Sequence, residues 1–247
     1  MKSARVYGAW LLLLCGATIA SAQRFSTEPF EQNDGYVNLL AGDNLGGVVA
    51  GDSLTATGSG SSSSISVSGL ATAAGFAGGV EAGWYKSIFG AEIEDLLARD
   101  GLAPSNVTFN GSSIGGSVSG TFDQFKATQN FLLFNGLLRF FRQDTSWGLW
   151  YPYTGAGLGF VSGSASNATT GASGYSLQTS HAGDIKFGVA GTWDNGFGLS
   201  VEYQTLISGY NMVLPPTTYS GATSTATLSG TAINSVLNVG LSYHFHL

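Results

Sequence analysis

Apolar and polar residues alternate along many segments of this chain, and this period of two restricts its fold more than any other feature. From residue 197 to 203 every odd position is apolar, while Gly, Ser and Glu fill the even positions. From 237 to 245 the pattern returns, with Asn, Gly, Ser and His between apolar residues. Successive side chains of a strand point to opposite faces, so each segment predicts a strand with one apolar face. We expect eight strands, at about 35–43, 73–85, 88–98, 126–141, 149–161, 179–193, 197–209 and 231–247.

Charge decides which way the apolar faces point. A soluble sandwich or a lipocalin-like barrel also alternates, but its polar faces meet water and carry many charged residues. Charged residues make up only 10% of this chain, against about 25% in ordinary soluble domains. The predicted polar faces hold mainly Gly, Ser, Asn and Gln, which suits a narrow lumen filled by side chains. The fold class is therefore all-β: a closed eight-stranded antiparallel up-and-down transmembrane β-barrel.

The connectors between the strands alternate in length. Short ones lie at 86–87, 142–148 and 194–196, and Asn195-Gly196 is a strong signal for a tight hairpin. Parts of the long ones alternate too, so we expect strands to extend beyond the membrane. Short periplasmic turns and long extracellular loops are typical of outer-membrane barrels. The long connectors are 44–72, 99–125, 162–178 and 210–230.

The N-terminus has the features of a secretory signal peptide. Lys2 and Arg5 precede a short apolar run, and Ala20-Ser21-Ala22 forms a cleavage site. Cys15 is the only cysteine and would leave with the signal, so the mature chain would have no disulfide. No later stretch of about 18 apolar residues predicts a membrane helix. We expect a signal peptide at 1–22, a short periplasmic leader at 23–34, the barrel at 35–247, and the outer membrane of a Gram-negative bacterium as the location.

Aromatic residues gather beside the short connectors. Amphipathic rings prefer the depth of the lipid headgroups, so this placement predicts an aromatic girdle at one membrane interface. We assign to it Trp84, Tyr85, Trp147, Trp150, Tyr151, Trp193, Phe197, Tyr243 and Phe245.

Several stretches resemble one family of proteins. They lie at 75–84 (GFAGGVEAGW), 89–94, 151–159, 199–204 and 235–245. These stretches resemble the small outer-membrane β-barrel family that includes the opacity-type porins and the transmembrane domain of outer membrane protein A. The resemblance implies outer-membrane lipids and lipopolysaccharide as surroundings and the barrel-assembly machinery as a partner during biogenesis. The family usually ends on an aromatic residue, whereas His246 and Leu247 follow Phe245 here, which predicts a weakened assembly signal.

Seven ionisable residues fall on predicted lumen faces. A charge in a narrow lumen must be paired or hydrated, because an unpaired buried charge is expensive. One hypothesis is a structural network that fills the barrel, and the other is a gate in which Arg139 or Lys186 exchanges carboxylate partners. For Arg139 we expect a partner among the glutamates of other strands. The network comprises Arg139, Lys186, Glu81, Glu92, Glu94, Glu202 and Asp184.

Catalytic and metal chemistry find little support. Ser180 and His181 point to opposite faces, so they predict no nucleophile–base pair. His244 and His246 share a face and would need a third ligand to hold a metal. The glycines at 155–159 superficially resemble a dinucleotide loop but lie within a strand. We therefore predict no catalytic residues, no metal and no cofactor.

The function expected from the sequence is structural or surface interaction, through long loops rich in Ser, Gly and Thr whose ligand is unknown. The alternative is a small low-conductance porin for ions or small solutes. A third hypothesis is a lipid-modifying outer-membrane enzyme. Scattered basic residues argue against nucleic-acid binding.

Overall fold

The computed structural model describes most of the chain that follows the predicted signal peptide. The predicted signal peptide, residues 23–32 of the leader, and Leu247 lie outside the described residues. The described ranges are 33–58, 61–102, 105–111, 116–122, 125–167, 175–213, 217–219 and 222–246.

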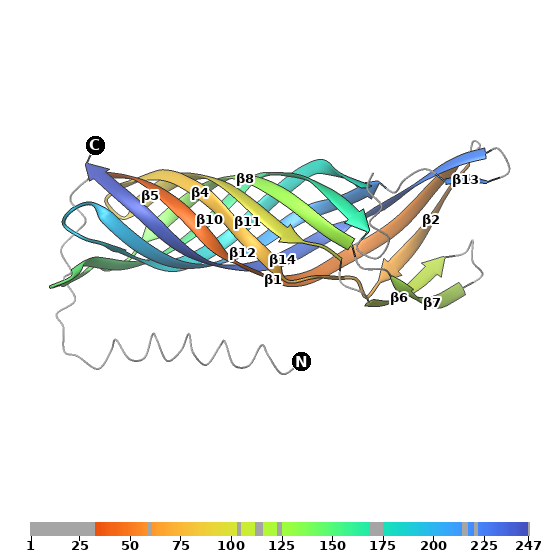
Figure 1. Cartoon of the computed structure of the whole chain (residues 1–247), viewed down its shortest axis with the longest axis horizontal. Helices are drawn as coiled ribbons and strands as arrows, with labels where there is room; N and C mark the ends of the chain where they lie inside the picture. Colours follow the sequence, from red (N-terminus) through yellow and green to blue (C-terminus); the bar gives the residue numbers. More distant parts are fainter. Residues whose placement is uncertain are drawn as a thin grey trace.

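Eight long antiparallel strands close into a ring, as the alternation predicts (Figure 1). Each strand pairs with the next long strand in sequence, and the last one, β14, pairs with the first, β1. No described helix is long and apolar enough to cross a membrane. The ring consists of β1 (Asn33–Gly58), β4 (Gly75–Lys86), β5 (Phe89–Asp100), β8 (Phe125–Arg139), β10 (Gly148–Asn167), β11 (Tyr175–Thr192), β12 (Phe197–Val213) and β14 (Ala222–His246).

The strands are staggered around the ring. Starting from Val37 on β1, the paired positions lead through Ala82, Ile93 and Phe134 to Leu158. They continue through Gly183, Ile207 and Ile233 and return to β1 at Val48, not at Val37. A fixed stagger of this kind requires the strands to tilt relative to the barrel axis, and it sets which side chains meet across the lumen.

The connections between strands are short at one end of the barrel and long at the other. At the short-turn end, Ser87 and Gly196 adopt positive φ angles of 57° and 86°, which tight hairpins require. At the long-loop end the strands continue as a sheet, drawn at the right of Figure 1. The first predicted strand, 35–43, is therefore only part of β1, which runs from Asn33 to Gly58. The shorter strands are β2 (Ser61–Ser68), β3 (Ala71–Thr72), β6 (Ser105–Gly111), β7 (Gly116–Phe122) and β13 (Thr217–Tyr219) at that end, and β9 (Gln143–Thr145) at the short-turn end.

The polarity of the barrel is inverted relative to a soluble protein. Leu39, Phe89 and Leu158 on the outer face are 61%, 66% and 76% exposed. On the inner face Arg139 and Lys186 are 2% and 0% exposed. Apolar surface around the whole ring would be costly in water and is favourable in lipid, so the structure is that of a transmembrane β-barrel.

Most side chains of the predicted aromatic girdle face outward. Seven of its nine residues lie at least partly exposed at the short-turn end, but Tyr85 and Tyr151 are only 3% exposed and point into the lumen. Their placement in the girdle was wrong because each follows an outward tryptophan, and neighbours along a strand face opposite ways. The outward set is Trp84, Trp147, Trp150, Trp193, Phe197, Tyr243 and Phe245.

Candidate functional site in the barrel lumen

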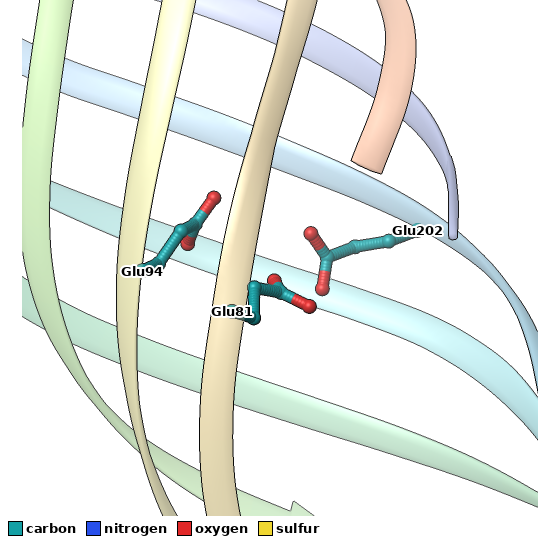
Figure 2. Close-up of side chains that lie close together, drawn as sticks. All are labelled: Glu81, Glu94 and Glu202. Carbon is teal, nitrogen blue, oxygen red and sulfur yellow. The ribbon is translucent and has the colours of Figure 1, made fainter. Parts of the chain in front are cut away.

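One buried lysine lies at the centre of the polar part of the lumen. The Nζ atom of Lys186 on β11 lies 2.8 Å from Oε1 of Glu81 and 2.8 Å from Oε1 of Glu92. It lies 2.7 Å from Oε2 of Glu94 and 3.4 Å from Oε2 of Glu202. Figure 2 shows Glu81, Glu94 and Glu202 approaching one another from different strands. We call Lys186 and the four glutamates that it contacts the lysine cluster: Lys186, Glu81, Glu92, Glu94 and Glu202.

Neutral donors surround the lysine cluster and hold its carboxylates in place. The hydroxyl of Tyr36 donates to Glu92, and that of Tyr153 donates to Glu202 at 2.9 Å. The amide of Asn38 donates to Glu81 at 2.7 Å. Hydrogen bonds to ionised groups are stronger than neutral ones, so these contacts fix the carboxylates as a rigid network.

Asp184 lies beside the lysine cluster without joining Lys186. The amide nitrogen of Gln204 donates to Asp184 at 3.0 Å and to Glu94 at 2.9 Å, which links the two carboxylates. The structure therefore brings together six of the seven ionisable residues predicted for the lumen, with Lys186 as their only cation among the described residues.

Arg139, the seventh, binds elsewhere. Its Nη1 lies 3.0 Å from Oδ2 of Asp34, and its Nε donates to the carbonyl of Ser87 at 2.6 Å. The guanidinium lies 4.5 Å from the ring centre of Tyr85 and 5.6 Å from that of Tyr151. We call Asp34, Tyr85, Arg139 and Tyr151 the arginine layer. The prediction that Arg139 pairs with a glutamate was wrong, because the Arg139 side chain lies nearer the short turns than the glutamates do.

Asp34 belongs to β1, although the sequence assigned it to the leader. His246 lies 3.3 Å from its other carboxylate oxygen and is largely exposed. The ring of His244 stacks on Tyr36, and its Nε2 lies 3.1 Å from Oγ of Ser242.

Two apolar layers cross the lumen beyond the lysine cluster. The inward residues of β8, followed from the short-turn end, are Arg139, Leu137, Asn135, Leu133, Phe131, Gln129, Ala127 and Phe125. The first apolar layer is formed by Leu40, Ala77, Leu96, Ala98, Phe131, Leu133, Val161, Ala182, Leu206 and Val236.

The second apolar layer lies nearer the long loops. Between the two layers, the amide of Asn234 donates to Asp100 at 2.9 Å, and Thr72 donates to Asn234. The second layer comprises Val49, Leu70, Leu102, Phe125, Ala127, Ala165, Leu177, Tyr210, Met212, Leu228 and Ala232.

The free space near the lysine cluster is small. A cavity of about 20 Å³ lies between this cluster and the arginine layer, lined by Tyr36, Glu92, Tyr153 and His244 among others. One water molecule needs about 10–15 Å³ measured in this way, so the cavity holds about one. The lumen at this level is a packed interior.

Sequence reasoning missed both the apolar layers and the tyrosine donors. Phe131 and Leu133 share the inward face of β8 with Arg139, which the sequence placed in the lumen, so the alternation carried the signal. Tyr36 and Tyr153 likewise share the inward faces of their strands. These large inward side chains were not predicted, because the inward residues of a membrane barrel were expected to be small or polar.

The sequence matches no model of a protein family and no curated protein. Among solved structures, the Neisserial surface protein A is similar, with 17% identity over 85% of this chain and 97% of that chain and a TM-score of 0.45. The outer membrane protein OprG of Pseudomonas aeruginosa has 14% identity over 88% and 98% and a TM-score of 0.44. The outer membrane protease OmpT of Escherichia coli has 10% identity over 89% and 99% and a TM-score of 0.40. Function does not follow from a likeness of this degree.

Proposed function

We propose that this protein is an outer-membrane barrel with a sealed lumen, whose role is to stabilise the membrane and to present the sheet at its long-loop end to the outside. The observation that carries the proposal is the succession of packed layers across the lumen. A conducting pore needs a continuous hydrated path, whereas here the lysine cluster is followed by two apolar layers.

The packing of the first apolar layer supports a sealed barrel. Leu96, Phe131 and Leu133 are each 0% exposed, although they line the inside of a tube. An eight-stranded barrel has an interior just wide enough for side chains to fill, and these side chains fill it.

The sheet at the long-loop end supports a role in display. Strand β1 continues through Gly58 and pairs with β14 as far as Ser224 and with β2 as far as Ser61. Strand β2 in turn pairs with β6, and β6 with β7. Strand pairing holds this Ser- and Thr-rich surface in one conformation, and ordered polar surface suits recognition by hydrogen bonds.

Conductance tests the sealed lumen. Purified barrel is inserted into a planar bilayer, and folding is checked by the change in gel mobility on heating. We expect no single-channel steps. Reproducible steps from folded protein would contradict the proposal and favour a small porin.

Site-directed labelling tests the orientation. The chain beyond the predicted signal peptide contains no cysteine, so a single one can be introduced into a clean background. Ser64 is exposed in the long-loop sheet, and Asn195 is exposed in a short turn. On intact cells a membrane-impermeant maleimide should label Ser64→Cys and should label Asn195→Cys only after the outer membrane is permeabilised. The reverse pattern would contradict the proposed display.

A further inference from the structure

The lysine cluster and Asp184 carry more negative charge than their surroundings compensate. Glu81, Glu92, Glu94, Glu202 and Asp184 are all at most 4% exposed, and Lys186 is the only cation that contacts them among the described residues. The charge of Arg139 is neutralised by Asp34 in the arginine layer. An uncompensated buried charge is expensive, so the excess must be neutralised by further positive charge.

Several buried oxygen atoms in and beside this group accept no hydrogen bond from any described residue. They include Oδ1 of Asp184, Oδ1 of Asn135, Oε1 of Gln204 and Oε1 of Glu94. Their side chains are at most 4% exposed. All four atoms are acceptors of the kind that hard cations bind.

The orientation of the two amides is set by the carboxylates. The nitrogen of Asn135 donates to Glu92 at 2.9 Å and to Glu94 at 3.1 Å. The nitrogen of Gln204 donates to Glu94 and Asp184. Because both nitrogens are engaged in this way, both amide oxygens remain as acceptors in a strongly negative environment.

Two of the four oxygens converge at Gly157 on β10. A Cβ atom at this glycine would lie 1.7 Å from Oδ1 of Asn135 and 2.6 Å from Oδ1 of Asp184. The two oxygens are therefore no more than about 4.3 Å apart, the sum of these distances. Oxygen ligands of one Ca²⁺ lie 2.3–2.6 Å from the ion, so two of them at this separation can share it.

We propose that Asp184 and Asn135, with Gln204 and Glu94 beside them, bind one hard cation of the calcium class inside the barrel. Carboxylate and amide oxygens are the ligands such a cation takes in proteins. Lys186 does not occupy this position, because its contacts are with Glu81, Glu92, Glu94 Oε2 and Glu202 and not with Asp184. The site goes beyond the proposed function, since a sealed barrel and a conducting one could both hold the ion.

Direct measurement of bound metal tests the site. The full-length mature protein is refolded in detergent at pH 8 with Ca²⁺, dialysed, and analysed by elemental mass spectrometry. We expect about one calcium per chain. We also expect the midpoint of urea unfolding to rise with Ca²⁺ and to fall when EDTA is added, while choline chloride of equal ionic strength has no such effect, because a ligand of the folded state alone stabilises it.

A matched pair of variants places the ion. Asp184→Asn removes one ligand charge and should weaken calcium binding at least about tenfold. Asp95→Asn is the same change at an exposed, outward-facing aspartate of β5 and should leave binding unaltered. Equal weakening in both variants would place the calcium on the outer surface and overturn the proposal. Should Asp184→Asn fail to fold, Glu94→Gln serves in its place.

The wild-type protein alone can overturn the inference. The inference is overturned if the folded barrel contains no calcium and its unfolding midpoint is the same in Ca²⁺ and in EDTA. Protons, and not a metal ion, would then neutralise the carboxylates. In that case stability would fall as the pH rises, because the carboxyl groups would lose their protons. A conductance result leaves this outcome untouched, so the two proposals fail separately.

Discussion

Removing the central lysine should strongly destabilise the barrel. Lys186→Met keeps most of the side-chain volume and deletes the ammonium that contacts four buried glutamates. Loss of one partner from a buried ion pair typically costs about 3–5 kcal/mol, because the remaining charge stays buried. The free energy of unfolding of a typical domain is about 5–15 kcal/mol, so the loss is a large part of the total.

The assay is urea unfolding of the refolded barrel in detergent, followed by the heat-dependent change in gel mobility. With a slope of about 2–3 kcal/mol per molar urea, a loss of about 3–5 kcal/mol lowers the midpoint by roughly 1–2.5 M. The titration is done in EDTA, so that a bound cation does not compensate for the missing ammonium.

Lys126→Met is the matched control, since Lys126 is exposed on the outer face of β8. Its effect should stay within about 0.5 kcal/mol. Adding Glu94→Gln to Lys186→Met should recover part of the loss, because one of the stranded charges is removed. A Lys186→Met barrel as stable as the wild type would refute the view that this ammonium holds the carboxylates together.

Further predictions concern the other layers and the outer face. Arg139→Ala should lower the free energy of unfolding by less than about 3 kcal/mol, because its partner Asp34 is partly hydrated. Arg142 is partly exposed and pairs with the exposed Asp144, so Arg142→Ala should change this free energy by at most about 0.5 kcal/mol in the same titration. Phe131→Ala should cost about 3–5 kcal/mol and still give no channel steps in planar bilayers, because the second apolar layer remains. In a tryptophan-free background, brominated lipid should quench the fluorescence of Phe89→Trp and not that of Tyr85→Trp; equal quenching would contradict the inward orientation of residue 85.

The alternation of apolar and polar residues, together with the low content of charged residues, was sufficient to predict the eight strands, their closure and the inward position of the charged side chains. This pattern is local, because the geometry of an extended backbone places neighbouring side chains on opposite faces whatever the strand pairs with. Glu92, Glu94 and Arg139 could therefore be assigned to the lumen from the sequence. The same rule, applied strictly, also places Tyr85 and Tyr151 inside, next to their outward tryptophans.

The partners across the lumen were decided only by the tertiary structure. Asn135 is paired with Glu92 on the neighbouring strand, so Arg139 lies four residues beyond it, toward the short turn, where Asp34 and Ser87 are within reach. The position of Arg139 along the barrel axis depends on the stagger that accumulates around the whole ring, and no single strand determines this stagger. Lys186 meets four glutamates for the same reason: the closure of the barrel, more than the sequence of β11, brings three other strands to its ammonium.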